Sequence, residues 1–112
     1  MPPVGGSKSN FLLSGAQIVA LNGRCSAKDG TLAGSTIDMA TAVRNCVRLL
    51  QVPLEEALRF ACTEPANFLG LGGSLGRLAA GYRADMVAFY PNELKLLATW
   101  VAGKRSDDVH DL

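Results

Sequence analysis

Histidine is nearly absent from this sequence, and its scarcity excludes several kinds of catalytic site. The single histidine is His110, near the C-terminal end, and no HxH or HExxH pattern occurs. A zinc site needs three or four converging ligands, so a histidine-based metal site is excluded. The stretch "DDVHD" (107–111) has suitable residue types, but we expect a frayed tail there, which preorganises nothing. Neither a Cys–His pair nor a GxSxG elbow is available for nucleophilic catalysis.

The sequence also lacks an excess of charge and long apolar runs. Eleven Lys and Arg residues face ten Asp and Glu residues, for a net charge of +1. A nucleic-acid partner is therefore not expected, because it would need a basic patch. No apolar run reaches the roughly 18 residues of a membrane span, and no secretory signal is recognisable. With 48% hydrophobic residues, the chain is predicted to fold rather than to stay disordered.

Cysteine is too scarce and too widely spaced to form a disulfide framework. The three cysteines are Cys25, Cys46 and Cys62. An odd number at these spacings favours small core residues in a reducing compartment, so we predict a cytoplasmic protein.

Helices are predicted for the middle of the chain. Apolar residues recur with the helical period from Met39 to Leu50, and either Thr36 or Ser35 is the predicted N-cap. A second helix is predicted over residues 53–62, starting at Pro53. Its adjacent carboxylates, Glu55 and Glu56, do not face each other and are interpreted as a capping feature.

A break and one further helical turn are predicted after the second helix. Pro65 should end that helix and should keep Glu64 out of helical conformation. One more turn is expected over residues 66–69, closed by Gly70.

Strands are predicted at both ends of the chain. Two or three short strands fit residues 10–26, with a hairpin turn at Asn22-Gly23. Residues 84–90 and 94–101 have strand patterns, and Ala102-Gly103 is a predicted turn. The order is therefore strands, helix, helix, short helix, strands. Because this order leaves the strands at the two ends without obvious partners, the chain looks like part of a larger protein.

The stretch "DGTLAGST" (29–36) lies directly before the first helix. It lacks the Gly-Lys-[Ser/Thr] end of a Walker loop, and "GGSLGR" (72–77) does not match GxGxxG. A helix N-terminus offers free N–H groups to an anion, but every helix does so. The residues alone therefore favour a capping turn over an anion site.

Several stretches together resemble the C-terminal third of N-acetylglucosamine-6-phosphate deacetylases. These are "DGTLAGS" and the following "MATAVRNCVRLLQVPLEEALRFACTEPANFLGL". "LGRLAAGYRADMVAFY" resembles the broader amidohydrolase ending G-x-L-x-x-G-x-x-A-D, and "TWVAGKR" resembles its closing strand and turn. The resemblance runs from Met1 to about Arg105.

This resemblance implies an α/β fold: the C-terminal part of a metal-dependent hydrolase (β/α)8 barrel, plus strands of its small β-sandwich domain. Residues 1–70 would form the last barrel loop and the C-terminal helices, with residues 1–36 in the loop after the last barrel strand. Residues 71–105 would return into the β-sandwich, and residues 106–112 would be a frayed tail.

The resemblance also implies a substrate contact. Leu32, Ala33 and Gly34 would contact the sugar-phosphate substrate with backbone groups, whereas no catalytic residue and no metal ligand would lie in this chain. A divalent metal, zinc or iron-like, and a catalytic Asp would belong to a missing N-terminal part, which is the expected partner alongside a homodimer. The alternatives are a stand-alone interaction module or small subunit, and another amidohydrolase such as a deaminase, which "DGTLAGS" disfavours.

Overall fold

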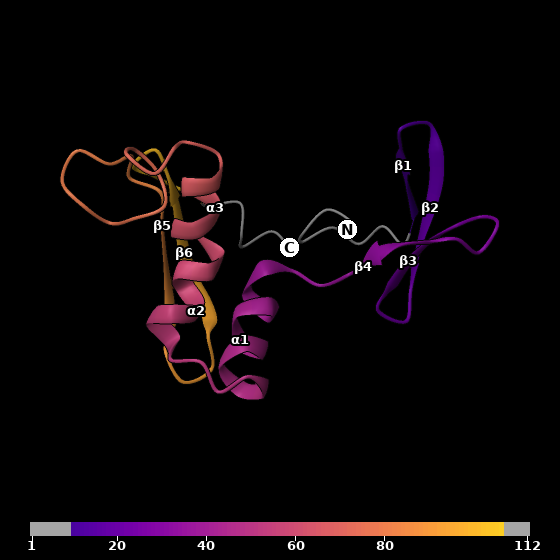
Figure 1. The fold of residues 1–112 in the computed structure, drawn as a ribbon, viewed down its shortest axis with the longest axis horizontal. Coiled ribbons are helices and arrows are strands. Elements are labelled where there is room, and N and C mark those ends of the chain that lie inside the picture. Colours follow the sequence, from indigo (N-terminus) through magenta and orange to yellow (C-terminus); the bar gives the residue numbers. More distant parts are fainter. Residues whose placement is uncertain (1–9, 107–112) are drawn as a thin grey trace. The chain divides into compact units, whose positions relative to one another are not determined.

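The computed structural model describes residues 10–106, and the chain divides into two compact units between Thr41 and Ala42. Figure 1 shows the course of the chain through both. The predicted loop at residues 1–6, the tail from residue 107 and His110 lie outside the described residues.

The first unit is an antiparallel meander of four strands. They are β1 (Asn10–Leu13), β2 (Ala16–Leu21), β3 (Arg24–Ala27) and β4 (Leu32–Ser35), paired in the order β1-β2-β3-β4. Asn22 and Gly23 connect β2 to β3 with φ of 53° and 79°, as a two-residue hairpin turn requires. The predicted strands and the Asn22-Gly23 turn are thus confirmed.

The start of the first helix differs from the prediction. Helix α1 covers Met39–Leu49, and the N–H of Thr41 donates to Oδ1 of Asp38 at 2.7 Å. Asp38 is therefore the N-cap, and the prediction of Thr36 or Ser35 was wrong. Pairing between β3 and β4 explains the difference, because Ser35 ends β4 and the N–H of Thr36 donates to the carbonyl of Gly23 at 3.2 Å.

The second unit packs helices against a small sheet. Helices α2 (Leu54–Ala61) and α3 (Thr63–Phe68) follow α1, and β5 (Met86–Tyr90), β6 (Lys95–Val101) and β7 (Lys104–Arg105) form the sheet β5-β6-β7. Its core is formed by three buried side chains, Val43 of α1, Ala57 of α2 and Leu94 of the β5–β6 hairpin. Partly buried apolar residues pack against them: Cys46, Val47, Val52, Leu54, Leu58, Ala61 and Phe89.

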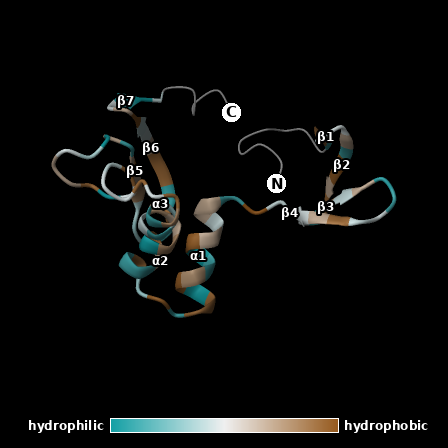
Figure 2. Cartoon of the chain, turned by 45° about the horizontal axis from the view of Figure 1, so that its top comes forward, coloured by the Kyte–Doolittle hydropathy of each residue, from teal (hydrophilic) through white to brown (hydrophobic). Residues whose placement is uncertain are grey.

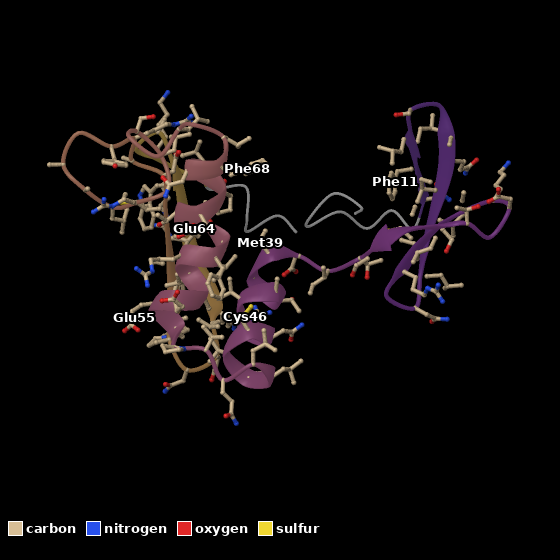
Figure 3. The ribbon with its side chains drawn as sticks, in the orientation of Figure 1. Phe11, Met39, Cys46, Glu55, Glu64 and Phe68 are labelled. Atoms are coloured by element: carbon tan, nitrogen blue, oxygen red, sulfur yellow. The ribbon has the colours of Figure 1, made fainter. Side chains whose placement is uncertain are left out.

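The apolar face of α1 is buried only in its middle. Val43 is buried, and Figure 3 shows Cys46 on the side of α1 that faces α2. Met39 and Leu50, at the two ends of the predicted stripe, are 58% and 68% exposed. The helical period is therefore confirmed, while the described chain leaves both ends of the stripe open to solvent.

The break between α2 and α3 falls earlier than predicted. The chain leaves helical geometry at Cys62, and Glu64 and Pro65 lie in the first turn of α3. A proline is tolerated there because its missing N–H would have no partner within the helix. The predictions for Glu64 and Pro65 were therefore wrong, whereas the closing glycine is confirmed: Gly70 has φ 75° and donates to the carbonyl of Asn67 at 3.0 Å.

The cysteines do not all belong to the core. Cys25 is buried and Cys46 is half-buried, but Cys62 is exposed. Cys62 is the C-cap of α2, and its exposure means that the prediction of a core residue was wrong for it.

Candidate functional site

The 32–34 segment (Leu32, Ala33 and Gly34) forms most of the edge strand β4. The structure thus corrects the prediction of an irregular capping turn over 29–36, since pairing with β3 extends these residues. Leu32 is 58% exposed, Ala33 is exposed and Gly34 is half-buried. Residues with this exposure are available for contact with a ligand.

A β-bulge lies inside the 32–34 segment. Ser26 pairs with Leu32 and Cys25 pairs with Gly34, so that Ala33 is the extra residue of β4. A bulge bends its strand and redirects a side chain, and bulges are frequent beside active sites. The backbone of the segment therefore departs from regular pairing where the family resemblance implies substrate contact.

A tight turn holds the start of the 32–34 segment. Asp29 accepts a hydrogen bond from the N–H of Thr31 at 2.9 Å, and the N–H of Ala27 donates to the carbonyl of Thr31 at 2.8 Å. The backbone hydrogen bond from Thr31 lowers the pKa of Asp29 below its usual value. Because folding lowers this pKa, the carboxylate stabilises the turn above its unfolded pKa. That stabilisation is lost as the pH falls through the folded value.

The acidic residue of the G-x-L-x-x-G-x-x-A-D motif has a structural role. Asp85 accepts a hydrogen bond from the N–H of Ala102 at 2.8 Å and pairs with Arg83 at 3.1 Å. The N–H of Gly103 donates to the carbonyl of Ala84 at 2.8 Å. Ala84 and Asp85, at the end of the motif, therefore stabilise the turn between β6 and β7 by hydrogen bonds.

We expect Asp85→Ala to lower the stability of the 112-residue chain by about 1 kcal/mol, because a hydrogen bond to a half-exposed carboxylate contributes about that much. Asp85→Asn keeps an acceptor oxygen and should recover most of the loss. Urea unfolding followed by circular dichroism measures both. Equal losses in the two variants would contradict this role for the acceptor.

A half-open cavity of about 420 Å³ lies between α2 and β5. Three arginines, Arg59, Arg77 and Arg83, are among its lining residues. Arg59 pairs with Glu56, Arg83 pairs with Asp85, and the guanidinium of Arg77 lies 5.7 Å from the ring centre of Tyr82. No sequence pattern indicates this cavity, because its walls come from separate segments. The three arginines that line it already have partners within the chain.

The described residues do not fit a metal centre. Within residues 10–106, no three or more His, Cys, Asp or Glu side chains come together as a possible ligand group.

None of the helices in this range has the length and apolarity that a membrane crossing needs.

The model of the amidohydrolase family matches residues 25–112. The chain belongs to the amidohydrolase family. A Haemophilus influenzae relative named N-acetylglucosamine-6-phosphate deacetylase is 34% identical to this chain, over 85% of the chain and 25% of the relative. A solved N-acetylglucosamine-6-phosphate deacetylase from Pasteurella multocida matches with a TM-score of 0.77 and 32% identity, over 88% of this chain and 26% of that one. The resemblance to these deacetylases is thus confirmed, and the chain spans about a quarter of their length.

Two Escherichia coli relatives differ from each other in length. An N-acetylgalactosamine-6-phosphate deacetylase from strain O157:H7 and a putative one from strain K12 are each 36% identical over 93% of this chain. The match covers 27% of the first relative and 62% of the second. The K12 relative is therefore less than half as long as the other.

Proposed function

We propose that this chain is the C-terminal segment of an N-acetylglucosamine-6-phosphate deacetylase. The intact enzyme would hydrolyse the acetamide of its substrate to glucosamine 6-phosphate and acetate. The observation that carries the proposal is the structural match at a TM-score of 0.77 with 32% identity over 88% of the chain. Relatives named for both the glucosamine and the galactosamine sugar support the class of amino-sugar phosphate.

The 32–34 segment is the proposed substrate contact of this chain. Leu32 and Ala33 are exposed, and the segment lies on an edge strand with a bulge at Ala33, so its backbone groups are available to a sugar phosphate. The divalent metal, zinc or iron-like, would activate water, and its ligands and the catalytic Asp would lie in the rest of the cytoplasmic enzyme.

Exposed apolar side chains in the second unit support the proposal that another part of the protein covers this surface. In the second unit β5 is an edge strand, and Val87, Leu96 and Val101 are 50%, 45% and 52% exposed. Figure 2 shows hydrophobic colour along β6 and on α1. Apolar residues gathered on strands in this way are typical of a covered interface. We infer that β5 to β7 join the small β-sandwich and that α1 and α2 cover the barrel.

The test is acetate release. The 112-residue chain with zinc or iron(II) should release no acetate from N-acetylglucosamine 6-phosphate, whereas the full-length protein with the same metal should release it. A chelator should abolish the release by the full-length protein. Metal-dependent turnover by the short chain, or none by the full-length protein, would contradict the proposal.

The short K12 relative favours a second candidate, a stand-alone interaction module. Gel filtration and amide hydrogen exchange of the 112-residue chain distinguish this module from a segment of a larger enzyme. A compact monomer with slowly exchanging strands supports the module, whereas a self-associated or loosely folded chain supports a segment that needs the rest of an enzyme.

A further inference from the structure

Cys25 is completely buried although it lies in a small meander. Its exposed fraction is 0%, and it lies on β3 between Ala20 of β2 and Gly34 of β4. A buried thiol behaves as a small apolar group with a weak donor, and its surroundings decide whether that donor is used.

The thiol of Cys25 is bonded to the chain that follows the 32–34 segment. Its Sγ donates to the carbonyl of Ser35 at 3.6 Å. In turn, Oγ of Ser35 accepts a hydrogen bond from the N–H of Ile37 at 3.0 Å. Cys25 therefore holds β4 at the residue where the chain turns away from the sheet.

The same cysteine marks the bulge. The register shifts between Cys25 and Ser26, whose partners on β4 are Gly34 and Leu32. A bulge interrupts the ladder of backbone hydrogen bonds and leaves its extra residue, here Ala33, unpaired with β3. A side-chain bond beside the interruption restricts the positions that the bulged strand can take.

We propose that Cys25 is a positioning residue: its thiol, bonded to the carbonyl of Ser35, fixes the bulged 32–34 segment in the geometry that contacts the sugar phosphate. The inference rests on the proposed function. Cys25 itself is buried and touches no substrate. Its contribution is to reduce the conformations of the segment before binding, which strengthens binding without new contacts.

The test compares Cys25→Ala with Cys25→Ser in the full-length protein, because serine keeps a donor and alanine does not. We expect Cys25→Ala to raise KM for N-acetylglucosamine 6-phosphate about fivefold, with kcat within about twofold. Cys25→Ser should retain a KM close to that of the unmodified protein. Cys46→Ala, at a half-buried cysteine of α1, is the matched control and should leave KM unchanged.

Amide exchange in the full-length protein tests the same inference without turnover. The N–H of Thr36 donates to the carbonyl of Gly23 and should exchange about fivefold faster in Cys25→Ala, while that of Cys62 stays unchanged. Equal effects of alanine and serine, or no effect of either, would overturn the role of the thiol. If Ala33→Asp also leaves KM unchanged, the proposed substrate contact fails rather than the role of Cys25 alone.

Discussion

Replacing Ala33 by aspartate in the full-length protein is expected to raise KM for N-acetylglucosamine 6-phosphate about a hundredfold. Ala33 is exposed and is the extra residue of the β4 bulge, in the segment proposed to contact the substrate. A new carboxylate about 4 Å from a phosphate would cost about 4 kcal/mol per pair of unit charges at an effective dielectric constant of about 20. About 2.7 kcal/mol is enough for a hundredfold change.

Ala16→Asp is the matched control for this substitution. Ala16 is exposed on β2 of the same meander, so its replacement makes the same change of charge on the same unit. Both variants should keep their stability within about 0.5 kcal/mol, as surface substitutions usually do. Steady-state kinetics at fixed ionic strength gives the two KM values. An equal KM in both variants would refute a substrate contact at Ala33.

Measurements at low and high salt distinguish two causes of a raised KM in Ala33→Asp: charge repulsion of the substrate and distortion of the β4 bulge. If the loss in Ala33→Asp is electrostatic, the ratio of its KM to that of the unmodified protein should decrease between low and high salt, because salt screens exposed charges. A bulge distorted by the longer side chain would leave the ratio unchanged.

The sequence predicted the elements well where the signal is local. The Asn22-Gly23 pair determines a two-residue turn by itself, since both residues accept positive φ. The helical period of α1 follows from residues within the same helix, and Gly70 ends α3 with a hydrogen bond to the nearby carbonyl of Asn67. Sequence signals that act within one turn or one helix predict that element without information about the rest of the fold.

The predictions that failed depend on distant partners. Thr36 looked like a cap because its hydroxyl suits that position, but its backbone N–H donates to Gly23, thirteen residues earlier. The bulge at Ala33 follows from the register against β3, which composition does not specify. The proposed substrate contact of residues 32–34 stays a prediction. It rests on the family resemblance, because a short exposed strand has no chemical pattern of its own.

Replacing Gly76 by alanine is expected to destabilise the 112-residue chain by about 3 kcal/mol. Gly76 has φ 92°, which strains an L-residue by about 1–2 kcal/mol. An added Cβ would lie 2.7 Å from Cβ of Ala66 and 2.9 Å from the carbonyl oxygen of Cys62. These atoms belong to the α2–α3 junction and cannot rotate away, so overpacking adds about 1–3 kcal/mol.

The Gly81→Ala variant distinguishes the cost of backbone strain from the cost of overpacking. Gly81 has φ 85°, but an added Cβ there meets no atom within 4 Å. Its replacement should therefore cost only the backbone strain, about 1–2 kcal/mol. Urea unfolding of both variants gives the difference, which we assign to the close approach of Gly76 to the α2–α3 junction. Thr63 makes this approach specific, because its hydroxyl donates to the carbonyl of Gly76 at 2.9 Å. Equal losses in the two variants would mean that the α2–α3 junction yields to an added methyl group.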